Sequence, residues 1–181
     1  MLDSWARKPP SIDWAVAAAA GVAGETSERG LRLLGVQAGD TLFVDGGAGG
    51  VGAVAVQMAL ARKVRVIASA SEANQDYLRE IGAIPVRYGQ GMADRVRAAA
   101  GGRVDAVFDV AGKTAIEELI RLVSEPGLAG MEVVECSPPY DHAEQTSLIA
   151  GRVVLDCLAI QVRKGVLGRR KAELERRAWG P

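Results

Sequence analysis

Glycines recur between residues 44 and 52 at a spacing that suits a phosphate-binding turn. Gly47, Gly49 and Gly52 form the pattern G-x-G-x-x-G directly after an apolar run of strand length and ahead of a helical stretch. The first glycine permits a tight turn, the second lets the backbone approach a pyrophosphate, and the third lets the helix pack against the strand. Backbone N–H groups at the helix N-terminus attract phosphates, so the segment is predicted to bind a dinucleotide, the alternative being a tight turn without a ligand. The predicted contact residues of this loop are Gly47, Ala48, Gly49, Gly50, Val51 and Gly52.

The end of the second predicted strand indicates which dinucleotide binds. An acidic residue about 20 positions beyond the glycines would accept hydrogen bonds from the ribose of NAD. Ser69 and Ser71 stand there instead, and small hydroxyl groups admit a 2′-phosphate without repelling it. NADPH is therefore favoured over NADH as the cofactor. Glu72 keeps NADH open, because it could reach the ribose or lie in the first turn of the next helix.

The residues that most often bind metals or act as catalysts are scarce in this chain. His142 is the single histidine, and it follows a turn-rich segment in which the adjacent Asp141 points in another direction. No G-x-S-x-G elbow accompanies it, so it is predicted to lie in a surface loop. Cys136 and Cys157 lie in apolar stretches and indicate reduced core residues. The sequence predicts no metal site and assigns no catalytic residue.

Asp105 and Asp109 are four residues apart on a predicted strand and therefore share a face. Paired carboxylates can do acid–base chemistry, whereas the family resemblance described below implies that Asp109 accepts a hydrogen bond from loop backbone. Short-chain dehydrogenases need Tyr-x-x-x-Lys, and no tyrosine here has a lysine four residues later. A methyltransferase that binds S-adenosylmethionine remains a rival, although it usually has an acid at the end of strand two.

Apolar runs of strand length alternate with stretches of helical length, which is typical of parallel βαβ units. We expect an α/β fold, a Rossmann-type doubly wound parallel sheet of about six strands in three layers. The predicted strands are Thr41 to Val44, Val64 to Ser69, Ile84 to Arg87, Val104 to Val110, Met131 to Cys136 and Val153 to Ile160. The predicted helices between them are Val51 to Ala61, Glu72 to Ile81, Gly91 to Ala100 and Thr114 to Val123.

Two helices, Ile12 to Ala23 and Ser27 to Leu34, are predicted ahead of a turn at Gln37 to Asp40. Residues 1–160 are predicted to form one dinucleotide-binding domain, with residues 1–40 as lead-in helices. Residues 161–181 form a basic C-terminal tail with seven basic and two acidic side chains. The tail is a solvated terminal helix or a contact surface for an acidic partner.

Charge and hydropathy exclude two classes of partner. The chain of 181 residues has 22 Lys and Arg against 22 Asp and Glu, which gives no general attraction to nucleic acid or to an anionic membrane. Met1 to Lys8 lacks the apolar segment of a signal peptide, and no apolar run approaches the roughly 18 residues of a membrane helix. The expected location is the cytoplasm.

From about Trp5 to Gly127 the chain resembles the cofactor domain of the medium-chain dehydrogenase/reductases, especially the zinc-free quinone oxidoreductase branch. Order and spacing together make the resemblance specific. The segments that carry it are Arg7 to Pro10, Ala17 to Thr26, Gly35 to Thr41, Gly46 to Gly52, Val56 to Ala59, Ile81 to Ala83, Tyr88 and Val104 to Asp109.

The resemblance implies roles for single residues. Gly49 to Gly52 would hold the pyrophosphate, and Ser69 would lie near the adenosine 2′-position. Tyr88 would lie against the cofactor, and Thr26 would approach the nicotinamide. Gly47 stands where alanine is commoner in the family.

Family enzymes place a GroES-like catalytic domain ahead of the cofactor domain, and this chain starts at the junction. The resemblance therefore implies a truncated or split NADP(H)-dependent oxidoreductase that transfers hydride to a quinone or an enone. A non-catalytic NADPH-binding module or scaffold is the alternative. The implied partners, besides the dinucleotide, are a second copy paired through the last strand, Val153 to Ile160, or a separate catalytic-domain chain.

Overall fold

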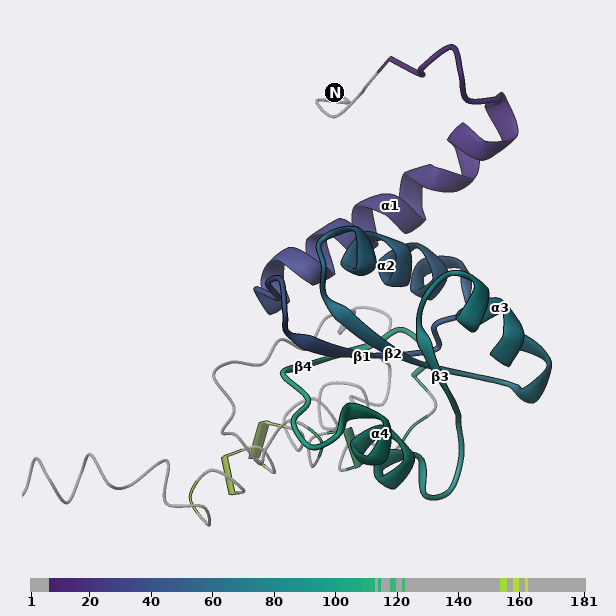
Figure 1. The fold of residues 1–181 in the computed structure, drawn as a ribbon. Helices are drawn as coiled ribbons and strands as arrows, with labels where there is room; N and C mark the ends of the chain where they lie inside the picture. The colour runs from purple at the N-terminus through teal and green to yellow at the C-terminus, as the bar shows by residue number, and fades with distance from the viewer. Residues whose placement is uncertain are drawn as a thin grey trace, which may run out of the picture.

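The computed structural model describes residues 7–112 and, beyond them, residues 114, 118, 119, 122, 154, 155, 158, 159 and 162 (Figure 1). Strands and helices alternate along the chain, which confirms the predicted α/β class. In order, the elements are α1 (Trp14–Leu34), β1 (Thr41–Asp45), α2 (Gly50–Ala61), β2 (Arg65–Ala70), the 3-10 turn η1 (Glu72–Asn74), α3 (Gln75–Glu80), β3 (Ile84–Arg87), α4 (Met92–Ala100) and β4 (Ala106–Asp109).

The four described strands form one parallel sheet in the order β3-β2-β1-β4. The chain moves outward from β1 to β3 and then returns to the other side of β1. Doubly wound sheets bind ligands beside the carboxyl ends of the strands where the order reverses, which here lies between β1 and β4. Four of the six predicted strands are thus confirmed, and Met131 to Cys136 lies outside the described residues.

Helices cover both faces of the sheet. In Figure 1, α1, α2 and α3 lie over one face and α4 lies against the other. Leu42 and Val44 of β1 belong to the core beneath the first group of helices, whereas Phe43 belongs to the core on the α4 side together with Leu119. Both faces of the strands are therefore apolar, as is typical of buried parallel sheets.

The first helix is continuous, and the prediction of two separate helices is wrong. The Asp13 side chain accepts a hydrogen bond of 2.8 Å from Val16 N at the start, and Gly35 ends the helix in the left-handed conformation. Glycine within a helix costs only about 1 kcal/mol. Burial of Ser27 and Leu31 against α2 offsets that cost, so the helix runs through Gly24.

The apolar run Val153 to Ile160, predicted as the last strand, is helical wherever the structure describes it. The described residues of this run are Val154, Leu155, Leu158 and Ala159, and Val162, which follows the run, is helical as well. Short apolar runs do not distinguish a strand from a helix by periodicity alone. Pairing of two copies through an edge strand here therefore loses its basis. Leu155 is 63% exposed.

Several sequence predictions concern residues that the structure does not describe. His142, Cys136 and Cys157 lie outside the described residues, as does the basic tail apart from Val162. No helix within the described part of the chain is long and apolar enough to cross a membrane. The cytoplasmic location stays a prediction.

Arg65 of β2 caps the C-terminus of α4, and we expect its replacement by methionine to destabilise the domain. Its Nη1 donates to the carbonyl oxygen of Ala100 and its Nη2 to that of Ala99, each at 2.6 Å. Arg65→Met removes both bonds and should lower the free energy of unfolding by about 1–2 kcal/mol, measured by urea denaturation. Arg65→Lys keeps the positive charge but lacks the planar set of guanidinium N–H donors, so it should lose less stability than Arg65→Met. Equal stabilities of Arg65→Met and the unmodified protein would contradict this assignment.

Candidate functional site

A tight turn joins β1 to α2 at the carboxyl edge of the sheet. It begins at Gly46, whose φ of +88° few residues other than glycine adopt. Gly49 N donates to Gly46 O at 3.0 Å and closes the turn. Gly47 N donates to Ser69 O at 2.9 Å and attaches the turn to β2. Backbone hydrogen bonds within the turn and to β2 therefore hold the loop in place.

No side chain fits at two of the glycines of this turn. A Cβ atom on Gly52 would lie 2.1 Å from the carbonyl oxygen of Gly46, and one on Gly47 would lie 2.5 Å from the Cβ of Ala68. The structure thus gives the third glycine the close approach that the pattern predicts. An alanine at position 47, common in the family that the sequence resembles, would collide with Ala68 in this chain.

The N-terminus of α2 offers uncapped backbone donors. Gly49 is its N-cap, no described side chain hydrogen-bonds to this end, and its first turn contains no acidic residue. The first intrahelical bond runs from Ala53 N to Gly49 O at 2.8 Å. The N–H groups of Gly50, Val51 and Gly52 therefore have no acceptor within the helix. This arrangement, with open space beside Gly50, fits a phosphate group.

A buried carboxylate lies beneath the turn. Asp45, the last residue of β1, is 1% exposed and accepts hydrogen bonds from the hydroxyls of Ser69 and Thr114. Gly46 N in turn donates to Ser69 Oγ at 2.8 Å. Ser69 is itself 1% exposed, so the structure places it under the loop, and its contact with a cofactor stays a prediction. A structural role for Asp45 was not recognised in the sequence, although an acid between a buried strand and a glycine turn is a usable signal.

The other predicted site residues lie around the same edge. Ser71 follows β2 and is half-buried, and Tyr88 follows β3 with 60% of its surface exposed. Thr26 is half-buried on α1, next to Ser27, whose hydroxyl donates to Val51 O in the first turn of α2 at 3.1 Å. The structure therefore brings α1 at Thr26 close to the start of α2.

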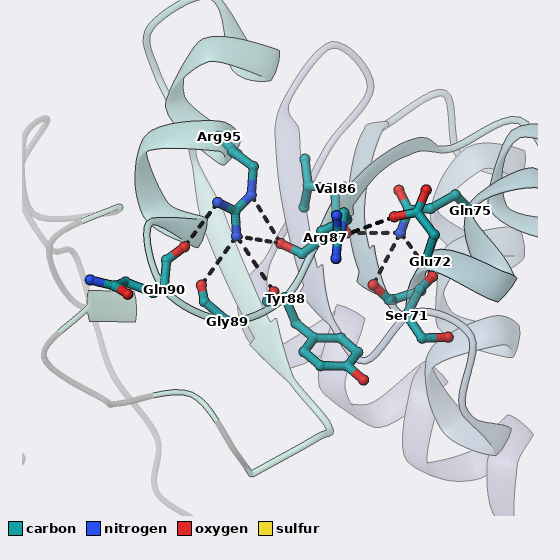
Figure 2. A network of polar contacts seen from close by, with 10 residues as sticks. Ser71, Glu72, Gln75, Val86, Arg87, Tyr88, Gly89, Gln90 and Arg95 are labelled. Carbon is teal, nitrogen blue, oxygen red and sulfur yellow. Dashed lines mark hydrogen bonds and ion pairs between the residues drawn. The ribbon is translucent and has the colours of Figure 1, made fainter.

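Gln75 fastens the end of β2 to the end of β3. Its side-chain nitrogen is close enough to donate to the carbonyl oxygens of Ala70 at 3.0 Å, Ser71 at 3.2 Å and Val86 at 3.2 Å (Figure 2). The side chain is buried, so these bonds are shielded from water. Gln75 thus sets the spacing of the two strand ends.

Arg95 of α4 fixes the turn that carries Tyr88. Its guanidinium reaches four consecutive backbone carbonyls (Figure 2). The acceptors are Arg87 at 2.8 and 3.1 Å, Tyr88 at 3.5 Å, Gly89 at 3.1 Å and Gln90 at 2.9 Å. Neither Arg95 nor Gln75 was identified from the sequence, because residue spacing does not reveal side-chain bonds to the backbone of another segment.

The two aspartates near β4 accept hydrogen bonds from backbone N–H groups, as was predicted for Asp109. Asp109 Oδ1 accepts from Ala111 N and Gly112 N, both at 2.9 Å, and shapes the turn at the carboxyl edge. Asp105 accepts from Thr41 N at 2.8 Å ahead of the strand. Within the described residues, no group of three or more His, Cys, Asp or Glu side chains could hold a metal ion.

Two sequence models of protein families match the chain. The model described as "Zinc-binding dehydrogenase" matches residues 50–135, which include α2 to β4. The model described as "Arginase family" matches residues 112–159 and overlaps the end of the first match. The second match begins after the end of β4, the last strand of the described sheet. Only the first match includes the start of α2 and the strands that follow it.

Several relatives and solved structures similar to the chain are named as reductases or oxidoreductases. The 2-methylene-furan-3-one reductase of Solanum lycopersicum is 30% identical over 137 residues, which are 74% of this chain and 34% of that protein. The quinone oxidoreductase of Coxiella burnetii is 31% identical with a TM-score of 0.59, over 67% of this chain and 38% of that one. A mycobacterial protein solved with NADPH is 29% identical with a TM-score of 0.62, over 82% of this chain and 55% of that one. The chain thus spans about a third of the length of the tomato relative.

Alanine at position 52 should disrupt the turn, whereas alanine at position 50 should not. Gly52→Ala places a methyl group against the Gly46 carbonyl and should lower the free energy of unfolding by about 3 kcal/mol. Gly50→Ala meets nothing within 4 Å and should raise it by about 0.5 kcal/mol through the helix propensity of alanine. Chemical denaturation of both variants measures the difference. Equal stabilities of the two variants would refute the close approach.

Gly47→Ala should be partly rescued by a change on the neighbouring strand. The single substitution brings two Cβ atoms together and should cost about 2 kcal/mol. Ala68→Gly removes the opposing methyl group, so the double variant should be more stable than the sum of the single effects predicts, by about 1 kcal/mol. A double-mutant cycle from urea denaturation measures this coupling. Strict additivity would contradict the contact.

Proposed function

The chain belongs to the medium-chain dehydrogenase/reductase superfamily and is similar to its quinone oxidoreductases, and on that premise we propose that it binds NADPH. We further propose that it forms the cofactor-binding part of an oxidoreductase that transfers hydride to a quinone or an enone. The names of its relatives support this reaction class: a furanone reductase, an NADPH-dependent alkenal/one oxidoreductase and quinone oxidoreductases. Its whole activity and its substrates are part of the proposal.

The observation that carries the proposal is the uncapped start of α2 behind the glycine turn. The N–H groups of Gly50, Val51 and Gly52 would donate to the pyrophosphate, and the helix dipole adds a partial positive charge there. Gly47, Ala48 and Gly49 would line the approach. Because the donors are backbone groups held by the turn, they need no rearrangement when the phosphates arrive.

The two halves of the cofactor would extend to either side of the pyrophosphate. Adenosine would lie at the carboxyl ends of β2 and β3, beside Ser71 and the exposed ring of Tyr88, with Ser69 supporting the loop from below. The nicotinamide would lie on the Thr26 side, where α1 meets α2. The cofactor supplies the hydride when bound, and this chain supplies binding and orientation.

A second candidate function is binding without turnover. The chain spans 34% of the tomato relative, and reduction by NADPH requires a substrate site from which water is excluded. Within the described residues, the aspartates at the sheet edge bond to backbone or hydroxyl groups and form no acid–base pair. In that case a separate catalytic chain would supply the substrate site. A homodimer is the other proposed assembly.

Titration with NADPH followed by calorimetry tests the binding, and Gly50→Asp tests its place. An aspartate at the first position of α2 interacts favourably with the helix dipole, and its Cβ would meet no atom within 4 Å, so the fold should be retained or stabilised. Its carboxylate would repel the pyrophosphate, and we expect NADPH affinity to fall at least about tenfold. In Gly50→Asn, whose side chain has the same shape without the charge, NADPH affinity should fall less. Undiminished affinity in Gly50→Asp would refute this site.

Turnover separates the two candidate functions. Oxidation of NADPH in the presence of a panel of quinones and enones, followed by absorbance, supports the oxidoreductase proposal for this chain. Saturable NADPH binding without oxidation supports the non-catalytic module or a partner chain. Absence of binding to any nicotinamide dinucleotide would overturn both.

A further inference from the structure

One exposed ion pair bridges the ends of β2 and β3. Arg87 is the last residue of β3 and pairs in register with Ala70, the last residue of β2. Two residues further on, the carboxylate of Glu72 lies 3.0 Å from Arg87 Nε (Figure 2). The side chains are 68% and 71% exposed, so a ligand in solvent can reach both.

The backbone that carries this pair is fixed on both sides. The buried amide of Gln75 holds the carbonyls of Ser71 and Val86, which precede Glu72 and Arg87 respectively. Arg95 holds the carbonyl of Arg87 itself through two hydrogen bonds of 2.8 and 3.1 Å. The strand ends are therefore positioned independently of the ion pair. An exposed ion pair adds little stability, so Glu72 can leave Arg87 without loosening this edge.

We propose that Arg87 binds the 2′-phosphate of NADPH and that Glu72 is its intramolecular competitor. This inference rests on the proposed function and names the residues that set its coenzyme preference. In a doubly wound domain the adenosine ribose lies at the end of the second strand, where Ser71 and Glu72 are found. An arginine near this point suits a phosphate, because the guanidinium is a planar fork that matches phosphate oxygens.

The competition follows from charge. A 2′-phosphate is a stronger acceptor than a carboxylate and would take the place of Glu72 on Arg87. A ribose with a free 2′-hydroxyl cannot displace Glu72, and an unpaired Glu72 would itself accept hydrogen bonds from such a ribose. The same glutamate that makes the sequence ambiguous between NADPH and NADH is thereby occupied by Arg87. Coenzyme preference therefore depends on both residues.

A purely structural ion pair between β2 and β3 is the competing explanation. This explanation predicts that substitutions at Arg87 and at Glu72 change stability. It also predicts that they leave the ratio of NADPH affinity to NADH affinity unaltered. The pair between Arg62 and Glu28 provides a control, because it also joins two elements, with Arg62 half-buried and Glu28 exposed. It involves the C-terminal end of α2, away from the carboxyl edge of the sheet.

The test is calorimetric titration of the full chain with NADPH, NADH, adenosine 2′,5′-bisphosphate and AMP. Arg87→Gln should lose at least about tenfold in affinity for NADPH and for the bisphosphate, with little loss for NADH and AMP. Glu72→Gln should gain about threefold for the bisphosphate, because both the competition and the repulsion are removed. Arg87→Lys should recover part of the loss, and Arg62→Gln and Glu28→Gln should leave the ratio unchanged.

A double-mutant cycle sharpens the result. In Arg87→Gln the released Glu72 should turn the preference toward NADH, and the added Glu72→Gln should abolish any preference. Circular dichroism confirms that each variant is folded. Binding of NADPH with an unaltered NADPH-to-NADH ratio in Arg87→Gln would overturn this inference and leave the proposed function standing. Failure of the unmodified chain to bind any of the four probes would overturn both.

Discussion

The close approach of α2 to the turn after β1 is the constraint on which the site depends. With no side chain at Gly52, the first turn of the helix lies against the Gly46 carbonyl, so the strand end and the helix start are in close contact. The uncapped N–H groups are then aimed outward from the carboxyl edge of the sheet. A wider approach would leave the helix free to tilt, and a helix that tilts cannot present its donors in one fixed geometry.

Asp45 extends that constraint across the sheet. A buried carboxylate is costly unless its oxygens are hydrogen-bonded, and here Ser69 of β2 and Thr114, which follows β4, supply the donors. The polar group therefore ties three segments together at the point where the strand order reverses. Ser69 also accepts from Gly46 N, so the same hydroxyl links the carboxylate to the glycine turn. The loop position is thus coupled to the order of the strands.

Much of the fold could be predicted from the sequence, because it depends on local patterns. The strand Ile84–Arg87 was predicted with the observed bounds, since an apolar run between turn residues has few other solutions. The break proposed near Gly24 was wrong, because burial against α2 outweighs the cost of one glycine. The apolar run at residues 153–160 was assigned to the wrong element, because a short run fits either. Gln75 and Arg95 were missed, since their acceptors are backbone carbonyls in other segments.

Recognition is divided between backbone and side chains at this edge. The pyrophosphate would be bound by backbone N–H groups, whose placement depends on glycines and on the buried core. The ribose end is formed by exposed side chains, such as Glu72 and Arg87, that contribute little to the core. The first property can be recognised in a linear pattern of glycines. The second depends on the register of β2 with β3, which places residue 87 beside residue 70. Coenzyme preference can therefore differ between chains that share the same glycine pattern, and it has to be inferred from which charged side chains the sheet brings together.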